Sequence, residues 1–547
     1  MTHDVFNQPP PLENYNLFST DRALREAVDR EGAGWACESL TRFGATCGEP
    51  HVIALGQQAN KYAPLLHTHD RYGRRRDEVE FHPAWHELMT LSCAQGLHCA
   101  PWENPRGGAH AARAAAYLLY SQVENGTQCP LTMTYAAIPV LMKQAQALPM
   151  LADAWLPRLT SREYDQRFIP IDRKEGGLIG MGMTEKQGGS DVRANTTRAE
   201  PIGARGPGQP YRITGHKWFF SAPMCDAFLL LAKTDAGIGC FFLPRFTPEG
   251  ELNAVRLQRL KDKLGNKSNA SAEVEFDAAI AWLLGEEGRG VATIVEMATY
   301  TRLDCAIGTA GLMRQALAQA IHHATYRSAF GRPLIDQPLM QNVLADLAVE
   351  TEAATALIMR LARTFDAHDD ENAALLRRLL TPAVKYWLCK RGPFMAAEAM
   401  EVLGGNGYVE ESILPRIYRE LPLNSIWEGS GNIMCLDVLR AAARDADAYA
   451  AYFAELDAAR GADARLDAHI AKLRHELAVP GEQEALARRL VQALAVALQG
   501  ALLIQHAPPA VAEAFCASRI EGDWRGAFGT LPPHIDFNAI IERARPQ

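Results

Sequence analysis

The feature that most constrains the fold is a β-rich stretch that lies between long helical stretches. From about residue 176 to residue 284, glycines multiply and short runs of β-branched and aromatic residues alternate with turn residues. Such runs predict the strands of an antiparallel sheet or barrel. The runs cover residues 211–220, 228–233, 240–243, 255–260 and 272–276. The chain must therefore pack a β module among helices.

Helical sequence surrounds this stretch on both sides. The first 175 residues are mostly helical after a proline-rich start, and the clearest helix covers residues 109–124, which are rich in alanine and leucine. After Gly290 three long helical segments follow, and their lengths favour antiparallel packing into a bundle. These segments cover residues 291–328, 338–366 and 373–403.

The last 107 residues form an alanine-rich tail, with helical segments near 449–477 and 482–505. In the second segment leucine recurs every four residues, which predicts one apolar stripe. We expect this stripe to pack in the core of the tail, and the alternative is a groove for a partner helix. The stripe consists of Leu486, Leu490, Leu494, Leu498 and Leu502.

These observations predict an α+β fold in four domains. A length of 547 residues allows about three to five domains at roughly 100–200 residues each. The expected domains are a helical N-terminal domain, a central antiparallel β-barrel, a C-terminal helical bundle and an extra C-terminal helical domain. Their expected bounds are 1–175, 176–284, 285–440 and 441–547.

The charge and the cysteines narrow the class of protein. The chain carries 56 basic and 64 acidic residues, a formal charge of −8, which excludes a wholly basic nucleic-acid binder but not a local basic patch. The eleven cysteines are scattered and form no CxxC, so we expect reduced thiols in a cytoplasmic protein.

No targeting or membrane segment is expected. The N-terminus has no basic region followed by an apolar run, so no signal peptide is predicted. The longest apolar stretch, residues 491–504, is fourteen residues long and contains two glutamines, which is too short to span a membrane. The basic run of Arg71, Arg74, Arg75 and Arg76 is followed by two acidic residues, which favours a solvated loop over a phosphate site.

The common nucleotide, metal and hydrolase motifs are absent from the sequence. There is no Walker A sequence, no GxGxxG after a strand and no GxSxG elbow. His82 and His86 have the spacing of a metal pair on a helix, but no third ligand is evident. We therefore expect no metal site.

Two glycine-rich blocks carry the chemistry instead. The first is GMTEKQGGSDVRA at residues 182–194, and the second runs from EVLGGNGY at 401–408 to IWEGSGN at 426–432. Gly188, Gly189 and Ser190 make a backbone that a ligand can approach closely. The glycines at 404, 405 and 407 end a long helix with a turn suited to a phosphate or a flat cofactor.

These blocks resemble the two signatures of the acyl-CoA dehydrogenases. Supporting matches are GHKWFFS at 215–221, RSAFG at 327–331 with Gln341, and KLG at 263–265 leading to Ser271. The resemblance covers about residues 50–440. The motifs GMGMTEKQGGSD and NSIWEGSGNIMCLDVLR, the VFNQPPPL start and the long tail resemble one branch of that family, the alkylation-response flavoproteins with an extra C-terminal domain.

The resemblance implies FAD held between a helical domain and the β-barrel. It implies that Phe219 and Ser221 wall the isoalloxazine ring, and that Arg327 helps to hold the adenosine diphosphate half across the subunit interface of a homotetramer. The residues that the resemblance assigns to the cofactor are Met181, Gly182, Met183, Thr184, Gly189, Ser190, Phe219, Phe220, Ser221, Arg327, Phe330, Gln341, Gly404, Gly405, Gly407, Trp427, Gly429, Ser430, Gly431 and Asn432.

Glu428 matches the catalytic base of the family. Removal of a proton α to a thioester needs a carboxylate within hydrogen-bond reach, while the β-hydride passes to the flavin. Two neighbours depart from the family pattern, because Trp427 replaces a tyrosine and Ser430 replaces a threonine. The bulk of Trp427 is expected to narrow the space for an acyl chain. We expect no effect of this departure on FAD binding.

Two functions follow from the resemblance. One is a flavoprotein that binds duplex DNA and protects it against alkylation damage, with weak acyl-CoA dehydrogenation. The other is a genuine acyl-CoA dehydrogenase for a short or branched acyl-CoA, with the tail serving oligomer assembly. DNA binding requires basic side chains on phosphates, and the alternative for each is a solvated or ion-paired charge. The candidates are Arg256, Arg259, Lys261, Lys263 and Lys267, and Arg440, Arg488, Arg489, Arg519, Arg525, Arg543 and Arg545.

Overall fold

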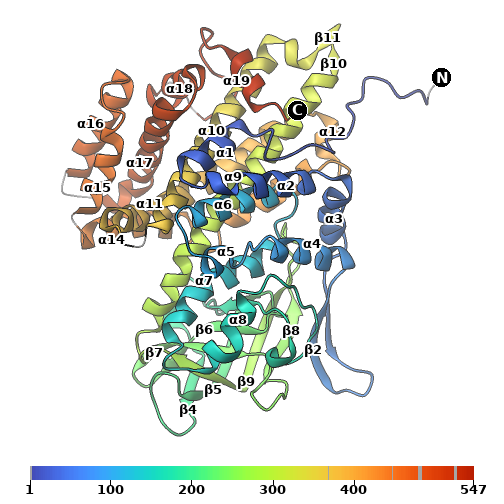
Figure 1. Cartoon of the computed structure of the whole chain (residues 1–547), viewed down its shortest axis with the longest axis vertical. Coiled ribbons are helices and arrows are strands. Elements are labelled where there is room, and N and C mark those ends of the chain that lie inside the picture. The colour runs from blue at the N-terminus through green and yellow to red at the C-terminus, as the bar shows by residue number, and fades with distance from the viewer. Residues whose placement is uncertain (1–2, 368, 446, 479–482, 523–525, 547) are drawn as a thin grey trace. The chain divides into compact units, whose positions relative to one another are not determined.

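The structure, a computed structural model, describes residues 3–367, 369–445, 447–478, 483–522 and 526–546. Two compact units make up the chain (Figure 1). The helical unit comprises Met1–Ile53, Arg106–Val123 and Arg302–Gln547. The barrel unit comprises Ala54–Pro105 and Glu124–Thr301. Two helices, α3 (Pro50–Lys61) and α9 (Gly290–Tyr326), contain residues of both units. The four-domain division stays a prediction.

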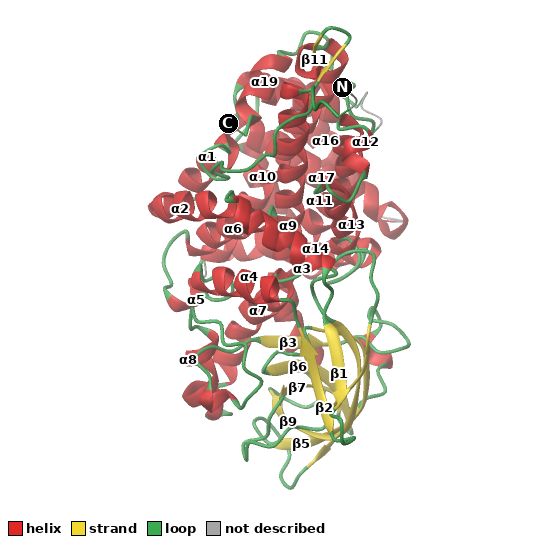
Figure 2. Cartoon of the chain, turned by 90° about the vertical axis from the view of Figure 1, so that its right-hand side faces the viewer, coloured by secondary structure: helices red, strands yellow, loops and turns green. Residues whose placement is uncertain are grey.

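The barrel unit is built on one seven-stranded sheet. Its path runs β3-β6-β4-β5-β9-β7, β6 also pairs with β7, and the sheet therefore closes into a barrel with β8 added on β9 (Figure 2). The strands are β3 (Ile179–Gly182), β4 (Arg198–Pro201), β5 (Pro210–Ser221), β6 (Ala227–Thr234), β7 (Gly237–Pro244), β8 (Val255–Leu260) and β9 (Ser271–Leu284). The expected α+β class with a β-barrel is confirmed.

The barrel differs from the expected antiparallel sheet in two pairings. β3 and β4 both pair with β6 in parallel, while the other pairings are antiparallel. The reason is that β5 returns the chain antiparallel to β4, so β6 again runs in the direction of β3 and β4. Gly215 lies at a shift of register in β5 with φ of 148°, and a Cβ atom there would come within 2.6 Å of the Thr197 Cα.

Short helices and a hairpin complete the barrel unit. The helices are α4 (Pro83–Ala94), α5 (Ala100–Glu103), α7 (Gln128–Gln144) and α8 (Leu156–Leu159). The hairpin pairs β1 (Leu65–His69) with β2 (Arg75–Glu80). The basic run expected in a loop thus lies partly in a strand, since Arg75 and Arg76 begin β2. There the two arginines form ion pairs with Asp77 and Glu78.

The helical unit contains the long bundle helices. α9, α10 and α11 confirm the three long helices expected after Gly290. The helices of this unit besides α9 and α3 are α1 (Arg22–Arg30), α2 (Cys37–Cys47), α6 (Ala109–Ser121), α10 (Pro338–Asp366), α11 (Glu371–Val402), α12 (Gly405–Tyr408), α13 (Leu414–Asn424), α14 (Gly431–Arg444), α15 (Asp447–Asp457), α16 (Ala464–Ala478), α17 (Gln483–His506), α18 (Pro509–Phe515) and α19 (Phe537–Ala544). A small hairpin joins β10 (Ser328–Ala329) to β11 (Arg332–Pro333).

The helix α6 is buried along its whole length. It packs against α2 and α10, and its Arg113 forms an ion pair with Asp304 of α9 in which both side chains are 1% exposed. Such a buried pair keeps its charges only when both partners are hydrogen-bonded, and here two guanidinium nitrogens donate to the two carboxylate oxygens.

The leucine stripe of the tail lies on α17. Four of its leucines are buried, whereas Leu486 is half exposed. The helix packs against α16 and α18 of the tail and also against α10, α11 and α14, so its core is shared between the tail and the bundle. A stripe of this kind buries its face on whichever elements surround it, and sequence periodicity does not name them.

α17 is also longer than the apolar stretch suggested. Gln483–His506 has the length and composition of a membrane-spanning helix, but 72% of its most apolar window is buried inside the protein. Contacts with neighbouring helices therefore account for its apolar character.

Candidate functional site

The first glycine-rich block forms a loop that follows β3 in the barrel unit. The loop turns back at Gly188, whose φ is 124° and whose N–H donates to the Glu185 carbonyl oxygen over 3.0 Å. A Cβ atom on Gly189 would come within 2.6 Å of the Thr184 Oγ1, so the hydroxyl lies directly against that glycine. Gly189 and Ser190 are exposed, and their backbone is open to a ligand.

A buried ion pair fixes this loop to the barrel. The Lys217 Nζ donates to the Glu185 Oε1 over 2.8 Å, and both side chains are fully buried. The Glu185 carboxylate also accepts hydrogen bonds from the backbone N–H groups of Thr196 and Thr197. Burial raises the pKa of Glu185, but the charge of Lys217 and these hydrogen bonds outweigh burial and lower it to about 2.

Strand β5 presents its aromatic residues on two opposite faces. Phe219 is 51% exposed, whereas the ring of Phe220 is fully buried and lies 4.3 Å from the ring of Phe228. Gly182 lies against that buried ring. Ser221 follows on the same face as Phe219, and its Oγ lies 3.3 Å from the Ser271 Oγ. The structure therefore places Phe219 and Ser221 outward, and Phe220 in the core. Met181, Met183 and Thr184, in and just after β3, are partly exposed.

In the helical unit, Glu428 lies in a tight turn between α13 and α14. Its φ is 57°, an unusual backbone conformation for a residue with a side chain, and the following Gly429 has φ of 101°. The Glu428 side chain is half-buried. Ser430, Gly431 and Asn432 then begin α14, and the Asn432 Oδ1 accepts a hydrogen bond from the Arg488 Nε over 2.8 Å.

Charged side chains hold the backbone of this turn. The Lys385 Nζ on α11 donates to the carbonyl oxygens of Trp427 and Gly429 over 2.7 Å and 2.5 Å. The Arg302 Nε on α9 donates to the carbonyl oxygen of Glu428 over 3.0 Å. Sequence reasoning missed both residues, although Lys385 stands out as the one charge in the apolar run AVKYWLC at 383–389.

A chain of hydrogen bonds through Asn424 and Thr309 orients the indole ring of Trp427. Its Nε1 donates to the Asn424 Oδ1 over 3.0 Å, and the Asn424 amide nitrogen donates to the Thr309 Oγ1 over 3.1 Å. Asn424 and Thr309 are buried. Trp427 therefore keeps one orientation beside Glu428.

The residues assigned to the adenosine diphosphate half are all in the helical unit. Phe330 lies at the tip of the β10–β11 hairpin with φ of 54° and is 97% exposed. The Gln341 amide donates to the Asn538 Oδ1 over 3.0 Å. Gly404 and Gly405 face open space, whereas a Cβ atom on Gly407 would lie 2.3 Å from the Met400 carbonyl oxygen. Packing thus requires Gly407, and only the other two glycines leave room for a ligand.

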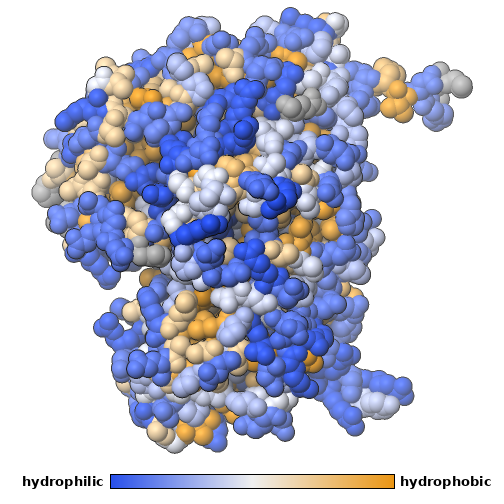
Figure 3. Space-filling view, in the orientation of Figure 1, coloured by the Kyte–Doolittle hydropathy of each residue, from blue (hydrophilic) through white to orange (hydrophobic). Residues whose placement is uncertain are grey.

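The N-terminal segment crosses this surface. The Asn7 side chain exchanges two hydrogen bonds with the backbone of Ser328, and the Arg327 Nη1 donates to the Asn7 carbonyl oxygen over 2.6 Å. Val5 and Phe6 are 85% and 80% exposed. Figure 3 shows this segment projecting from the surface with apolar atoms on it.

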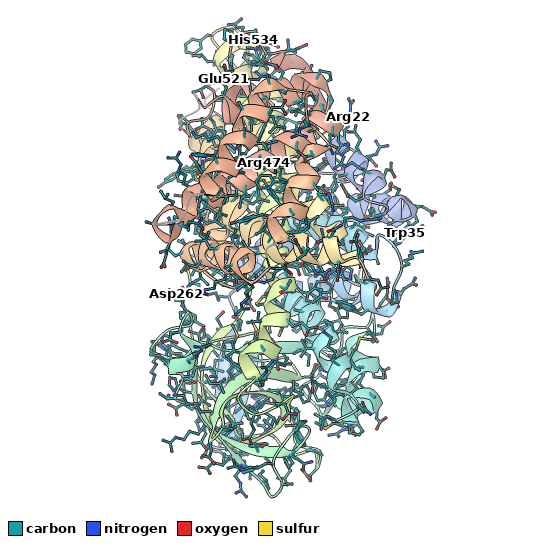
Figure 4. All side chains as sticks on the ribbon, turned by 90° about the vertical axis from the view of Figure 1, so that its left-hand side faces the viewer. Arg22, Trp35, Asp262, Arg474, Glu521 and His534 are labelled. Atoms are coloured by element: carbon teal, nitrogen blue, oxygen red, sulfur yellow. The ribbon has the colours of Figure 1, made fainter. Side chains whose placement is uncertain are left out.

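Most of the candidate DNA contacts in the barrel unit have an acidic side chain within 4.0 Å. Arg259 and Lys261 both pair with Glu273, and Arg256 lies 4.0 Å from Asp77. The Lys263 Nζ donates to the Asn269 carbonyl oxygen. Lys267 lies 3.9 Å from Asp262, a fully exposed residue that points outward in Figure 4.

The tail candidates follow the same pattern. Arg489, Arg543 and Arg545 pair with Glu476, Glu352 and Glu542. Arg519 is buried, and Arg525 lies outside the described residues. Arg440 and Arg488, on the neighbouring helices α14 and α17, have no ion pair in the described part of the chain and remain available to an anion.

The histidine pair is structural. His82 caps the N-terminus of α4 by accepting from the Ala84 N–H, and the His86 Nδ1 lies 3.0 Å from the Tyr164 hydroxyl. Among residues 3–546 that the structure describes, no group of three or more histidine, cysteine, aspartate or glutamate residues is suited to a metal ion.

Comparison with family models gives three matches along the chain. Residues 7–166 match the N-terminal domain of the adaptive response protein AidB. Residues 180–279 match the middle domain of the acyl-CoA dehydrogenases, and residues 288–443 match their C-terminal domain.

Individual proteins match over most of their length. The putative acyl-CoA dehydrogenase AidB of Escherichia coli (strain K12) is 52% identical over 94% of this chain and 94% of its own. Acyl-CoA dehydrogenase family member 11 of Caenorhabditis elegans is 30% identical over 89% of this chain and 83% of its own.

Solved structures show the same fold. Caenorhabditis elegans ACDH-11 in complex with C11-CoA has a TM-score of 0.86 and 28% identity, covering 97% of this chain and 96% of its own. Butyryl-CoA dehydrogenase from Megasphaera elsdenii has a TM-score of 0.56 and 21% identity, covering 78% and 98%, and so supports the fold alone.

Proposed function

The chain belongs to the acyl-CoA dehydrogenase family, and from this premise we propose that it binds FAD and oxidises acyl-CoA thioesters, with Glu428 as the base. The observation that carries the proposal is the turn at Glu428. Glu428, which the resemblance assigns as the family base, has an unusual backbone conformation and follows a tryptophan whose ring is oriented by a hydrogen bond.

The residues assigned to FAD fit a flat aromatic group with a charged tail. Phe219 and Ser221 offer an exposed ring and a hydroxyl on one face of β5, and the loop at Gly189 and Ser190 leaves backbone N–H groups accessible. Arg327 and the open glycines at 404 and 405 suit a pyrophosphate. Bound FAD would accept the hydride that leaves the β-carbon.

The chain itself performs the proton removal. The Glu428 carboxylate takes the α-proton of the thioester, and the electron pair of that C–H bond forms the α,β double bond as the β-hydrogen leaves with its own pair. The products are an enoyl thioester, a protonated Glu428 and a two-electron-reduced acceptor. Arg302 and Lys385 hold the turn in place during the transfer.

Trp427 shapes the substrate preference in this proposal. The Asn424–Thr309 network holds its indole ring in one orientation, and its volume exceeds that of the tyrosine expected from the family. We therefore propose a short or branched acyl group and slow turnover. A solved relative binds C11-CoA, so Trp427→Tyr is expected to admit longer chains.

The test is anaerobic mixing of the yellow holoprotein with a panel of acyl-CoA thioesters. Bleaching of the flavin absorbance by short or branched thioesters, abolished by Glu428→Gln, is expected. A colourless protein, or a Glu428→Gln variant that bleaches at the wild-type rate, would refute the proposal.

We also propose that duplex DNA binds this protein, as the resemblance to the alkylation-response branch implies, and that binding protects DNA against alkylation. Arg440 and Arg488 are the basic candidates without an ion pair in the described chain, and they support a small local contact. A mobility-shift titration at several salt concentrations tests this. A small negative slope of log affinity against log salt, reduced by Arg440→Ala with Arg488→Ala, is expected, and an unchanged slope would refute these contacts.

A homotetramer is proposed on the same basis. Phe330, Leu339 and Tyr408 are 97%, 84% and 79% exposed in the single chain, and we propose that contacts between subunits cover them. Sedimentation equilibrium would measure the assembly, and Phe330→Asp is expected to shift it to smaller species. All eleven cysteines are free, which supports the proposed cytoplasmic location.

A further inference from the structure

Lys385 is a buried charge whose hydrogen-bond acceptors are neutral. It lies on α11, and its side chain is 1% exposed. In the described part of the chain it has no ion pair, and its Nζ donates to the carbonyl oxygens of Trp427 and Gly429. Burial of an ammonium without a carboxylate partner is costly, so the two carbonyl acceptors are what compensates the charge of Lys385.

The acceptors of Lys385 flank one residue. Trp427 and Gly429 lie on either side of Glu428, and the carbonyl of Glu428 itself accepts from Arg302. Three successive carbonyl oxygens are therefore bound by two cationic side chains. Arg302 is in turn held by Asp437 on α14, 2.7 Å away, which also pairs with Arg378 on α11.

This arrangement explains the backbone conformation of Glu428. A φ of 57° costs a residue with a side chain about 1 kcal/mol or more, and it persists only where the surroundings determine it. The two peptide groups that define the conformation are those whose oxygens Lys385 and Arg302 bind. The direction in which the carboxylate leaves the turn is thereby set.

The charge of Lys385 also reaches the surroundings of the carboxylate. Burial raises the pKa of the Cys305 thiol well above its ordinary value, the ammonium of Lys385 opposes that rise, and the Glu428 carboxylate adds to it. Both charged groups therefore act on one buried thiol.

We propose that Lys385 is a positioning residue for Glu428: it binds the carbonyl oxygens of the residues before and after the base and so fixes the turn from which the carboxylate projects. The inference rests on the proposed function, in which Glu428 takes the α-proton. Lys385 touches neither the thioester nor the cofactor in this scheme, and it acts only through the turn.

The experiment compares Lys385→Met with the wild type and with Lys472→Met, an exposed lysine of α16 that serves as the matched control. The rate of flavin bleaching is measured over a range of concentrations of the best thioester of the panel. For Lys385→Met we expect kcat to fall at least about tenfold with little change in KM. Lys472→Met should match the wild type.

A second readout needs no turnover. Hydrogen exchange of the amides in residues 424–432 is followed in the protein without FAD. Faster exchange confined to this turn in Lys385→Met is expected. If Lys385→Met does not fold, Lys385→Gln takes its place, because its amide can donate to one of the two carbonyls.

The outcomes separate the two claims. A wild type that no thioester bleaches, or a fully active Glu428→Gln, would overturn the proposed function. A wild type that bleaches through Glu428, together with a Lys385 variant whose kcat and exchange are unchanged, would overturn the role of Lys385 alone. A lower kcat with unchanged exchange in residues 424–432, or a KM that rises in proportion to the loss of rate, would also overturn it, since the proposed role requires that the turn itself be loosened.

Discussion

A buried cluster of charges joins the tail to the bundle, and we predict that Arg519→Met lowers the free energy of unfolding by removing one member of this cluster. Arg519 lies between Asp346 and Glu350 of α10, and all three side chains are at most 4% exposed. Arg391 of α11 pairs with the same Glu350 over 2.9 Å. Two arginines thus balance two carboxylates in a site without solvent.

The magnitude follows from the unequal charges that the substitution leaves. Methionine keeps most of the volume but leaves Asp346 and Glu350 with one arginine between them. Burial raises the pKa of both carboxyl groups, and Arg391 and Arg519 outweigh burial at Glu350, lowering its pKa to about 2. Removal of one partner from such a cluster costs about 3–5 kcal/mol.

Urea unfolding at pH 7, followed by circular dichroism and fluorescence, measures this loss. The matched control is Arg489→Met, also in the tail, whose pair with Glu476 is 61% exposed on the arginine side and contributes about 1 kcal/mol or less. If Arg519→Met unfolded within about 1 kcal/mol of the wild type, the cluster would not anchor the tail, and the reasoning would be wrong.

Three further predictions concern single groups. Burial, with the charge of Arg327, lowers the pKa of His323 to about 4, so the unfolded chain binds more protons than the folded chain between pH 4 and 6.5. Stability therefore falls as pH drops through that window, and pH-dependent melting should show His323→Gln with a flatter profile. Glu185→Gln leaves the Lys217 ammonium buried without its carboxylate and should lower the free energy of unfolding in urea by about 3–5 kcal/mol. The variant should also lose FAD on gel filtration, and FAD that stays bound to it would contradict the role of the pair. Gly407→Ala should lower the free energy of unfolding by about 1–3 kcal/mol because its Cβ meets a backbone oxygen, while Gly405→Ala, which faces open space, should melt with the wild type.

The sequence predicted the elements whose pattern is local. β5 to β9 follow from alternating or continuous apolar runs, and the long helices from their length and composition. β3 and β4 were missed because four residues are too few to show a period. The helix expected at 449–477 is two helices, because the chain turns at Gly461 with a φ of 77°.

In the candidate site, too, the sequence predicted the residues that lie in contiguous motifs and missed the contacts between distant residues. Glu428 and the two glycine blocks were found because motifs are contiguous in sequence. The partners of Arg519 lie 169 and more residues away in the sequence. The sequence therefore suggested Arg519 as a DNA contact, whereas the fold buries it in ion pairs. Lys385 could be noticed as a charge in an apolar run, but its contact with a turn 42 residues later depends on how α11 packs.

The burial of α6 has a consequence for how the protein is made. Arg113 is synthesised well before its partner Asp304, which lies 191 residues later in the chain. The helix α10, which also packs against α6, is synthesised later still. At roughly 5–20 residues per second, a ribosome needs about 10–40 s to supply them. During that interval a helix with no exposed face in the finished protein can pack only against the helices made before it, α1 and α2. Synthesis should therefore recruit chaperones early, and a fragment that ends near residue 175 should be insoluble when expressed alone.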